Sequence, residues 1–189
     1  MQRQLVTSLV FVLVFLSESL ASADEYQDTV KIFRDAGESS RFFQISYGYA
    51  VFPTIGKGGV GIGGAYGSGR VYARGEHVGD TSMTQLTIGL QLGGQAYSQI
   101  IFLKDKRAMT EFTSGNFEFG AQASAVAITA GVSAGTNTAG TSAGVSAGKK
   151  DAKTVGKFEK GMAVFTIAKG GLMYEASIGG QKFSYKPVK

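Results

Sequence analysis

The segment Gln85-Leu86-Thr87-Ile88-Gly89-Leu90-Gln91-Leu92 carries the clearest pattern in the chain, because apolar residues alternate along it with polar or small ones. Side chains of a strand point to opposite faces in turn, so a period of two predicts a β-strand. The same period recurs in residues 47–52, 60–65 and 97–103. The fold is therefore predicted to be built on strands.

Glycine supplies 28 of the 189 residues and proline only 2. These glycines have no three-residue period, which excludes collagen, and each interior glycine costs a helix about 1 kcal/mol, which disfavours long helices. The hydrophobic fraction of 43% suits one packed domain and excludes global disorder. Glycine pairs suit the kinks and bulges of a strongly curved sheet; they occur at 58–59, 63–64, 93–94, 170–171 and 179–180.

Helices are expected at two places. Residues 24–38 have helical spacing, with Gly37 as a stop signal and Ser39 or Ser40 as the cap of a second short helix. Residues 104–112 form a mid-chain helix, with Asp105 near its start and Gly115 just past its end.

The strands predicted around these helices complete the fold. The first strand ends at Pro53, and 67–69 form a turn before a return strand. The later strands are expected at residues 70–74, 117–130, 162–168, 172–178 and 182–185. Residues 131–148 have low complexity and fit either a strand pair or a mobile loop. The predicted fold class is mainly β (α+β): a small curved, barrel-like antiparallel sheet flanked by an N-terminal helix and one mid-chain helix.

The N-terminus has the features of a signal peptide. Arg3 precedes an apolar run over residues 5–16, and Ala21-Ser22-Ala23 matches the small-x-small cleavage pattern. The run is shorter than the roughly 20 residues that span a bilayer. We expect export after removal of residues 1–23 and a single domain over 24–189; an uncleaved anchor is the alternative.

Residue types exclude several chemistries. The chain has no cysteine and one histidine, so disulfides, thiolate metal sites and multi-histidine sites are impossible. Residues 59–64 match G-x-G-x-x-G, but a strand follows where a nucleotide site needs a helix. G-x-S-x-G occurs around Ser133, Ser142 and Ser146, yet the only histidine lies upstream, whereas a hydrolase needs it downstream. We expect no enzyme activity, no metal, no cofactor and no nucleotide.

His77 lies in a turn-like segment between Glu76 and Asp80. Two neighbouring carboxylates could raise the pKa of the imidazole and make it sensitive to pH. A solvated loop histidine is the alternative interpretation.

Basic charge is concentrated near the C-terminus. Residues 24–148 carry nine Lys/Arg and ten Asp/Glu, whereas residues 149–189 carry nine lysines and three acids, which nets to +6. The densest run comprises Lys149, Lys150, Lys153, Lys157 and Lys160. An anionic membrane attracts each such lysine by about 1 kcal/mol, so five reach only a Kd of roughly 0.2 mM. Useful affinity needs apolar insertion or a headgroup pocket as well; a solvated loop is the alternative.

Taken together, several motifs resemble the SYLF domain family. They are Ser40-Arg41-Phe42-Phe43, Tyr47-Gly48-Tyr49-Ala50-Val51-Phe52-Pro53, Lys57-Gly58-Gly59-Val60-Gly61-Ile62-Gly63-Gly64-Ala65-Tyr66-Gly67-Ser68-Gly69, Ile88-Gly89-Leu90-Gln91-Leu92-Gly93-Gly94-Gln95, Ile100-Ile101-Phe102-Leu103, Phe119-Gly120-Ala121-Gln122-Ala123-Ser124 and Lys169-Gly170-Gly171-Leu172-Met173. The resemblance implies a lipid-binding module. Eukaryotic relatives bind phosphoinositides and, in fungi, bundle actin, whereas bacterial relatives are usually exported. The signal peptide, the absence of an SH3 or FYVE partner domain and the insertion at 131–148 depart from the eukaryotic pattern, so actin and phosphoinositides are not carried over.

The leading hypothesis is an exported, non-enzymatic module that binds anionic phospholipid or another anionic envelope surface. Lys57, which begins one of these motifs, joins the five clustered lysines as a candidate anion-binding residue. The expected location is periplasmic or secreted and peripherally membrane-associated, and nucleic acid is not an expected partner. The alternatives are a small integral outer-membrane β-barrel and an envelope structural or interaction protein with a protein partner.

Overall fold

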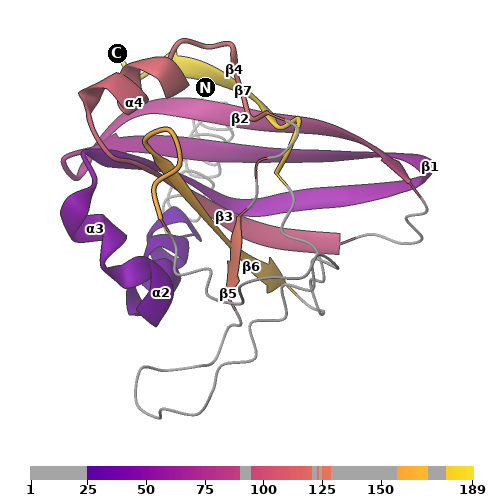
Figure 1. Ribbon diagram of the computed structural model, residues 1–189, viewed down its shortest axis with the longest axis horizontal. Coiled ribbons are helices and arrows are strands. Elements are labelled where there is room, and N and C mark those ends of the chain that lie inside the picture. Colours follow the sequence, from indigo (N-terminus) through magenta and orange to yellow (C-terminus); the bar gives the residue numbers. More distant parts are fainter. Residues whose placement is uncertain (1–24, 90–94, 121–122, 124, 129–156, 170–177) are drawn as a thin grey trace, which may run out of the picture.

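The computed structural model describes residues 25–89, 95–120, 123, 125–128, 157–169 and 178–189. Seven strands form one sheet in the order β4-β7-β2-β1-β3-β6-β5 (Figure 1). The strands are β1 (Gly48–Ala73), β2 (Glu76–Gly89), β3 (Gln95–Leu103), β4 (Phe117–Glu118), β5 (Val126–Ile128), β6 (Met162–Lys169) and β7 (Lys182–Pro187). The helices cover residues 25–35, α2 (Gly37–Ser40), α3 (Phe42–Ile45) and α4 (Lys106–Phe112). The sheet curls into a half-barrel, which confirms the predicted mainly β fold class.

One pair of strands departs from the predicted antiparallel arrangement. Strand β5 pairs in parallel with β6, whereas the other neighbours are antiparallel. The single strand predicted over residues 117–130 is also wrong, because residues 119, 120, 123 and 125, among those the structure describes, lie outside strands β4 and β5. These two strands lie at opposite edges of the sheet. The described residues between them, 119, 120, 123 and 125, therefore connect the two edges of the sheet.

Strand β1 turns back on itself near its middle. Residues 48–57 pair with β3, whereas residues 61–73 pair with β2. Gly59, with a φ of +153°, lies at the reversal, and a Cβ there would be only 2.3 Å from the Cα of Gly63. Figure 1 shows the two arms running side by side to an end that lies far from α2 and α3.

The turn predicted at residues 67–69 is wrong, because this segment is continuous strand. Its glycines make room for the neighbouring arm of β1. A Cβ on Gly67 would lie 2.5 Å from Cγ1 of Ile55, and one on Gly69 would lie 2.6 Å from Cδ1 of Phe52. Both neighbours are fully buried, so glycine is required here for packing rather than for chain reversal.

The predicted end of a strand at Pro53 is also wrong. Proline has no N–H to donate to a ladder, and β1 accommodates it by a shift of register between Phe52 and Ile55. The carbonyl of Pro53 accepts a hydrogen bond of 2.7 Å from Oγ of Ser98. The strand therefore continues beyond the proline.

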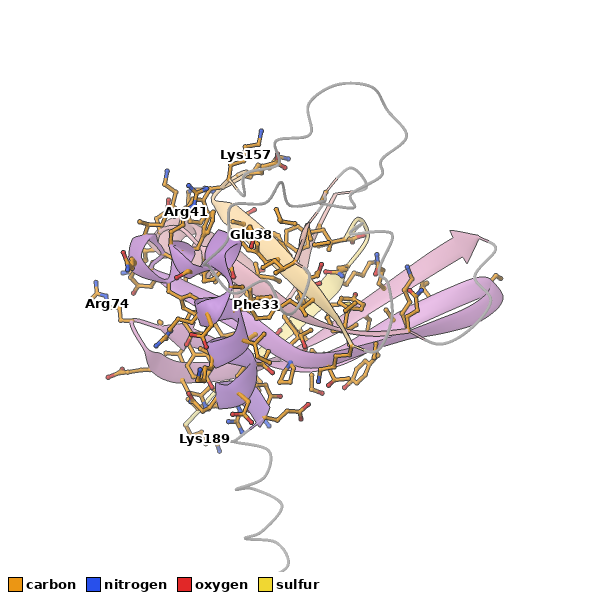
Figure 2. The ribbon with its side chains drawn as sticks, turned by 90° about the horizontal axis from the view of Figure 1, so that it is seen from below. Phe33, Glu38, Arg41, Arg74, Lys157 and Lys189 are labelled. Atoms are coloured by element: carbon orange, nitrogen blue, oxygen red, sulfur yellow. The ribbon has the colours of Figure 1, made fainter. Side chains whose placement is uncertain are left out.

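The helices of residues 25–45 cover one face of the sheet (Figure 2). Phe33 and Phe42 are buried there, and the ring of Phe42 packs against Phe165 and Phe102, with centroid separations of 4.9 Å and 5.5 Å. Burying one such ring contributes about 1.5–3 kcal/mol. The apolar helix spacing seen in the sequence therefore corresponds to a buried face.

The predicted cap of the second helix is wrong. Ser39 is buried, and its hydroxyl donates to the carbonyl of Phe33. The residue before α3 is Arg41, which has a helical φ of −62° and no side-chain cap. Arg41, the one residue between α2 and α3, has helical backbone angles. The start of α3 therefore leaves no N-cap position for Ser39 or Ser40.

The opposite face of the sheet is covered by α4 and the segments that follow it. Asp105 caps α4, since its Oδ1 accepts a hydrogen bond of 2.9 Å from the N–H of Ala108. Phe112, near the helix end, packs against Phe183 of β7 with ring centroids 5.1 Å apart. This confirms the predicted mid-chain helix and its start.

His77 lies in strand β2 rather than in a turn, so this part of the prediction is wrong. Its Nε2 lies 3.1 Å from Oδ1 of Asp80, and its ring lies 5.5 Å from that of Tyr72. The turn before it is made by Arg74 and Gly75, both with positive φ. The imidazole is therefore part of the strand's packing and not a free loop group.

Within the described ranges, no helix has the length and apolar character needed to cross a bilayer. The predictions for residues 1–23, 131–148 and 172–177 lie outside the described residues.

Candidate ligand-binding site

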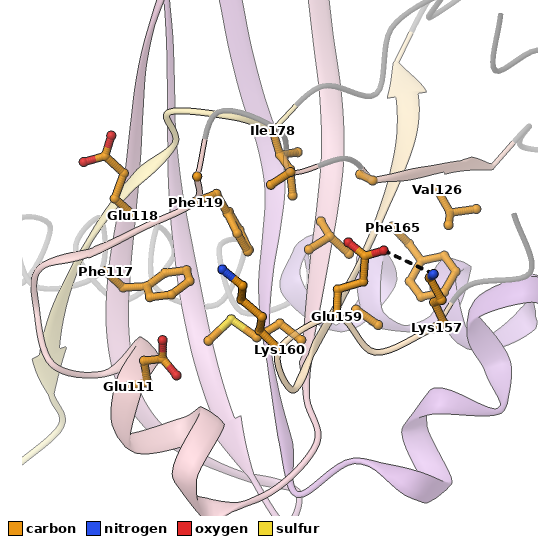
Figure 3. Close-up of a pocket in the computed structure, with 16 residues that line it drawn as sticks. Glu111, Phe117, Glu118, Phe119, Val126, Lys157, Glu159, Lys160, Phe165 and Ile178 are labelled. Atoms are coloured by element: carbon orange, nitrogen blue, oxygen red, sulfur yellow. Dashed lines mark ion pairs between the residues drawn. The ribbon is translucent and has the colours of Figure 1, made fainter. Parts of the chain in front are cut away.

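A cavity of about 330 Å³ lies between β6 and the described residues that connect β4 to β5 (Figure 3). Ligand pockets in proteins measure about 300–1,000 Å³, so this one suits a small ligand. Its lining residues are Glu111, Phe117, Glu118, Phe119, Gly120, Ala123, Ala125, Val126, Lys157, Glu159, Lys160, Met162, Ala163, Val164, Phe165 and Ile178.

The floor of the cavity is apolar because the β6 residues that line it, 162–165, are all apolar and buried. Met162 and Val164 share one face of the strand and are 6% and 7% exposed. Phe119 and Ile178, which lie on the two segments above this face, are 8% and 2% exposed. Backbone hydrogen bonds hold these segments together, since the N–H of Ile178 donates to the carbonyl of Ala123 at 3.3 Å.

The mouth of the cavity is charged, and its acids have cationic partners. Glu111 pairs with Arg107 at 3.1 Å, Glu118 with Lys182 at 3.5 Å, and Glu159 with Lys157 at 3.5 Å. Exposed pairs of this kind contribute about 0–1 kcal/mol each. Their main effect here is to neutralise the negative charge of the three carboxylates. The mouth therefore does not repel an anion strongly.

Lys160 is the mouth lysine for which no ion pair is found among the described residues. Its backbone has a positive φ of 51°, and Gly161 follows with a φ of 87°. Arg107 Nη2 donates to the carbonyl of Lys160 at 3.2 Å, which fastens this turn to α4. Figure 3 shows the Lys160 side chain pointing toward Phe117 and Phe119. An exposed cation therefore lies at the mouth of the cavity.

The structure brings together two of the six lysines predicted to bind anions. Lys157 and Lys160 line the cavity, whereas Lys57 lies on the arm of β1 that pairs with β3. Lys149, Lys150 and Lys153 lie outside the described residues. The binding role of all six stays a prediction.

The basic C-terminal region is not one patch in the described part of the chain. Lys169 lies 3.5 Å from a carboxylate oxygen of Glu25 and donates to Thr54 Oγ1 at 2.7 Å. Figure 2 shows Lys157 and Lys189 at opposite ends of the molecule. The net charge of this region therefore says little about local potential at any single site.

A buried amide cluster on the inner side of the sheet was not predicted from the sequence. Gln99 and Gln181 are fully buried; Gln99 Nε2 donates to Gln181 Oε1 at 2.9 Å, and Gln181 Nε2 donates to the hydroxyl of Tyr97 at 3.2 Å. Burial raises the pKa of Tyr97 to about 12, and the hydrogen bond from Gln181 opposes this only in part. The sequence did offer one indication of this cluster: Gln99 lies on the same face of its strand as the apolar Ile101 and Leu103, which are buried.

This arrangement suits an amphiphile. The floor accepts an apolar chain, and Lys160 can bind an anionic end at the mouth. The described lining residues include no histidine, serine or threonine, so the contacts on offer are apolar or ionic.

Comparison with known protein families assigns this chain to one of them. Residues 84–186, more than half of the 189, match the family model Ysc84, described as a Las17-binding protein actin regulator. The chain belongs to this family, whose domain is also called SYLF, and the resemblance drawn from its motifs is confirmed. All residues that line the cavity lie within the matched region.

A relative in Aeromonas veronii is named Beta cell expansion factor A. It is 28% identical over 158 residues, which cover 82% of this chain and 51% of the relative. The chain therefore spans about half the length of the curated relative that it matches.

Proposed function

We propose that this chain is an exported, non-enzymatic lipid-binding module that associates peripherally with an anionic envelope surface, in the periplasm or after secretion. The observation that carries the proposal is the cavity, because it combines an apolar floor with a lysine at its mouth. The ligand class is an amphiphile with an anionic end, of which anionic phospholipid is the envelope representative.

The lysines at the mouth and the apolar floor of the cavity make separate contributions to the binding free energy. Each lysine near an anionic surface contributes about 1 kcal/mol, which is weak and sensitive to salt. Burying four methylene groups in the cavity adds about 3 kcal/mol, or roughly 100- to 200-fold in affinity. The apolar floor thus supplies the second contribution that the lysines alone lack.

Co-sedimentation of the full chain with vesicles tests the proposal. We expect binding to phosphatidylglycerol-containing vesicles at low salt and weaker binding to pure phosphatidylcholine. Lys160→Gln is expected to reduce binding severalfold, whereas Lys186→Gln, an exposed lysine at the far end of β7, is the charge-matched control. Equal loss in both variants would show a diffuse charge effect without a site.

Native mass spectrometry tests the cavity itself. We expect the purified chain to carry one amphiphile in a fraction of molecules, and Ala125→Phe to remove it by filling the lined space. An unchanged bound fraction in Ala125→Phe would place the lipid elsewhere.

A further inference from the structure

The far end of β1 and β2 exposes large apolar side chains. Ile62 is 73% exposed, Leu86 is 84% exposed and Tyr66 is 58% exposed. Leu86 is paired with Gly64, which lies midway between Ile62 and Tyr66, so all three side chains project from one face. We name these three residues the arm patch.

The other face of the same strands is covered. Ala65 and Gln85 are paired across β1 and β2, and each is 6% exposed. Gln85 Nε2 donates to the carbonyl of Gly179 at 2.8 Å. The arm patch is therefore the outer side of a supported sheet and not the surface of a loose loop.

Charge is distributed unevenly along these two strands. Residues 54–69 and 81–89 contain one charged residue, Lys57. The opposite end of the same strand pair carries Arg70, Arg74, Glu76 and Asp80. An end without acids and with one lysine fits an apolar, anionic environment better than it fits water.

We infer that the arm patch inserts into the interfacial layer of an anionic lipid bilayer. This rests on the proposed function only for the class of partner, since the arm patch is separate from the cavity. Ile62 and Leu86 supply apolar area, and Tyr66, whose hydroxyl lies 3.4 Å from Ser68 Oγ, has the amphipathic ring that favours the headgroup level.

A bilayer is a better occupant than a second copy of the chain. A stable protein interface needs about 800 Å² of well-packed surface on each partner. Here Leu86 lies directly opposite Gly64, so it has no directly paired side chain to pack against, and three exposed side chains make a patch far smaller than such an interface. Acyl chains can adapt to such separate projections, whereas a rigid protein surface cannot.

The chain has no cysteine, so a single introduced cysteine can be labelled with an environment-sensitive fluorophore. Leu86→Cys carries the label in the arm patch, and Ile45→Cys, at a 55% exposed position on α3, is the matched control. With phosphatidylglycerol-containing vesicles we expect a blue shift and quenching by spin-labelled lipid at position 86 only.

Serine variants measure the energetic share of the patch. Ile62→Ser and Leu86→Ser are each expected to reduce vesicle partitioning about tenfold, and Ile45→Ser less than about twofold, with unchanged circular dichroism. If the unlabelled chain binds vesicles but the label at position 86 stays in water, the insertion is refuted while the proposed function stands. If the chain binds no vesicles, both fail. If the serine variants leave vesicle partitioning unchanged and alter only the oligomeric mass of the free protein, the patch is a contact between copies and the inference is overturned.

Discussion

Replacing Gly69 by alanine tests how the two arms of β1 pack. A Cβ at this position would lie 2.6 Å from two ring atoms of Phe52 and 2.9 Å from the carbonyl oxygen of Val51. The Phe52 ring is fully buried and packs against Phe183, with centroids 5.7 Å apart, so it cannot move aside freely. Overpacking of this kind costs about 1–3 kcal/mol. At 2 kcal/mol the Tm falls by roughly 4–8 °C for a domain of this size.

Urea denaturation followed by circular dichroism measures the free energy of unfolding. Gly56→Ala is the matched control, because it lies on the same strand and an added Cβ meets nothing within 4 Å. We expect this control to be neutral or stabilising by about 0.5 kcal/mol, since alanine loses less backbone freedom on folding. Equal midpoints for Gly69→Ala and Gly56→Ala would refute the packing and favour an open turn at 67–69.

Three further predictions concern stability. Asp105→Ala should lower the free energy of unfolding by about 1 kcal/mol through loss of the cap on α4, and Asp105→Ser should retain most of it in the same urea assay. Gln181→Leu should cost about 1–3 kcal/mol because it leaves Gln99 and Tyr97 without partners, and adding Gln99→Leu should recover part of that loss in a double-mutant cycle. Because the pKa of Tyr97 is raised from 10.0 to about 12, the neutral phenol stabilises the fold below pH 10, and this contribution is lost as pH rises toward 12. Tyr97→Phe should flatten stability over that window, and an unchanged slope would contradict the assignment.

The candidate site was predictable only in part. The lysine run indicated an anionic ligand, and Lys157 and Lys160 do line the cavity. The apolar floor was not predictable, because Phe119 and Ile178 are distant in sequence and are brought together by backbone hydrogen bonds between their segments. The ionic partner of Lys182 likewise depends on the pairing of β4 with β7.

The arm patch was likewise predictable only in part. Alternation in residues 85–92 predicted a β-strand, and the part of this segment that the structure describes is strand. On that strand the apolar Leu86 is 84% exposed, while the polar Gln85 is 6% exposed. Period two defines two faces, but the neighbouring segments decide which face is covered, and here Gly179 covers the side of Gln85.

Local conformational preferences explain what could be inferred from the chain alone: several strands, the capped helix α4, the mainly β class and the family motifs follow from short-range patterns. The roles of the glycines did not follow. Gly59 allows β1 to reverse, whereas Gly67 and Gly69 make room for Ile55 and Phe52, although all lie in the same kind of sequence. Folding distinguishes them because a missing side chain permits either a positive φ or a close approach, and only contacts between distant segments determine which is used.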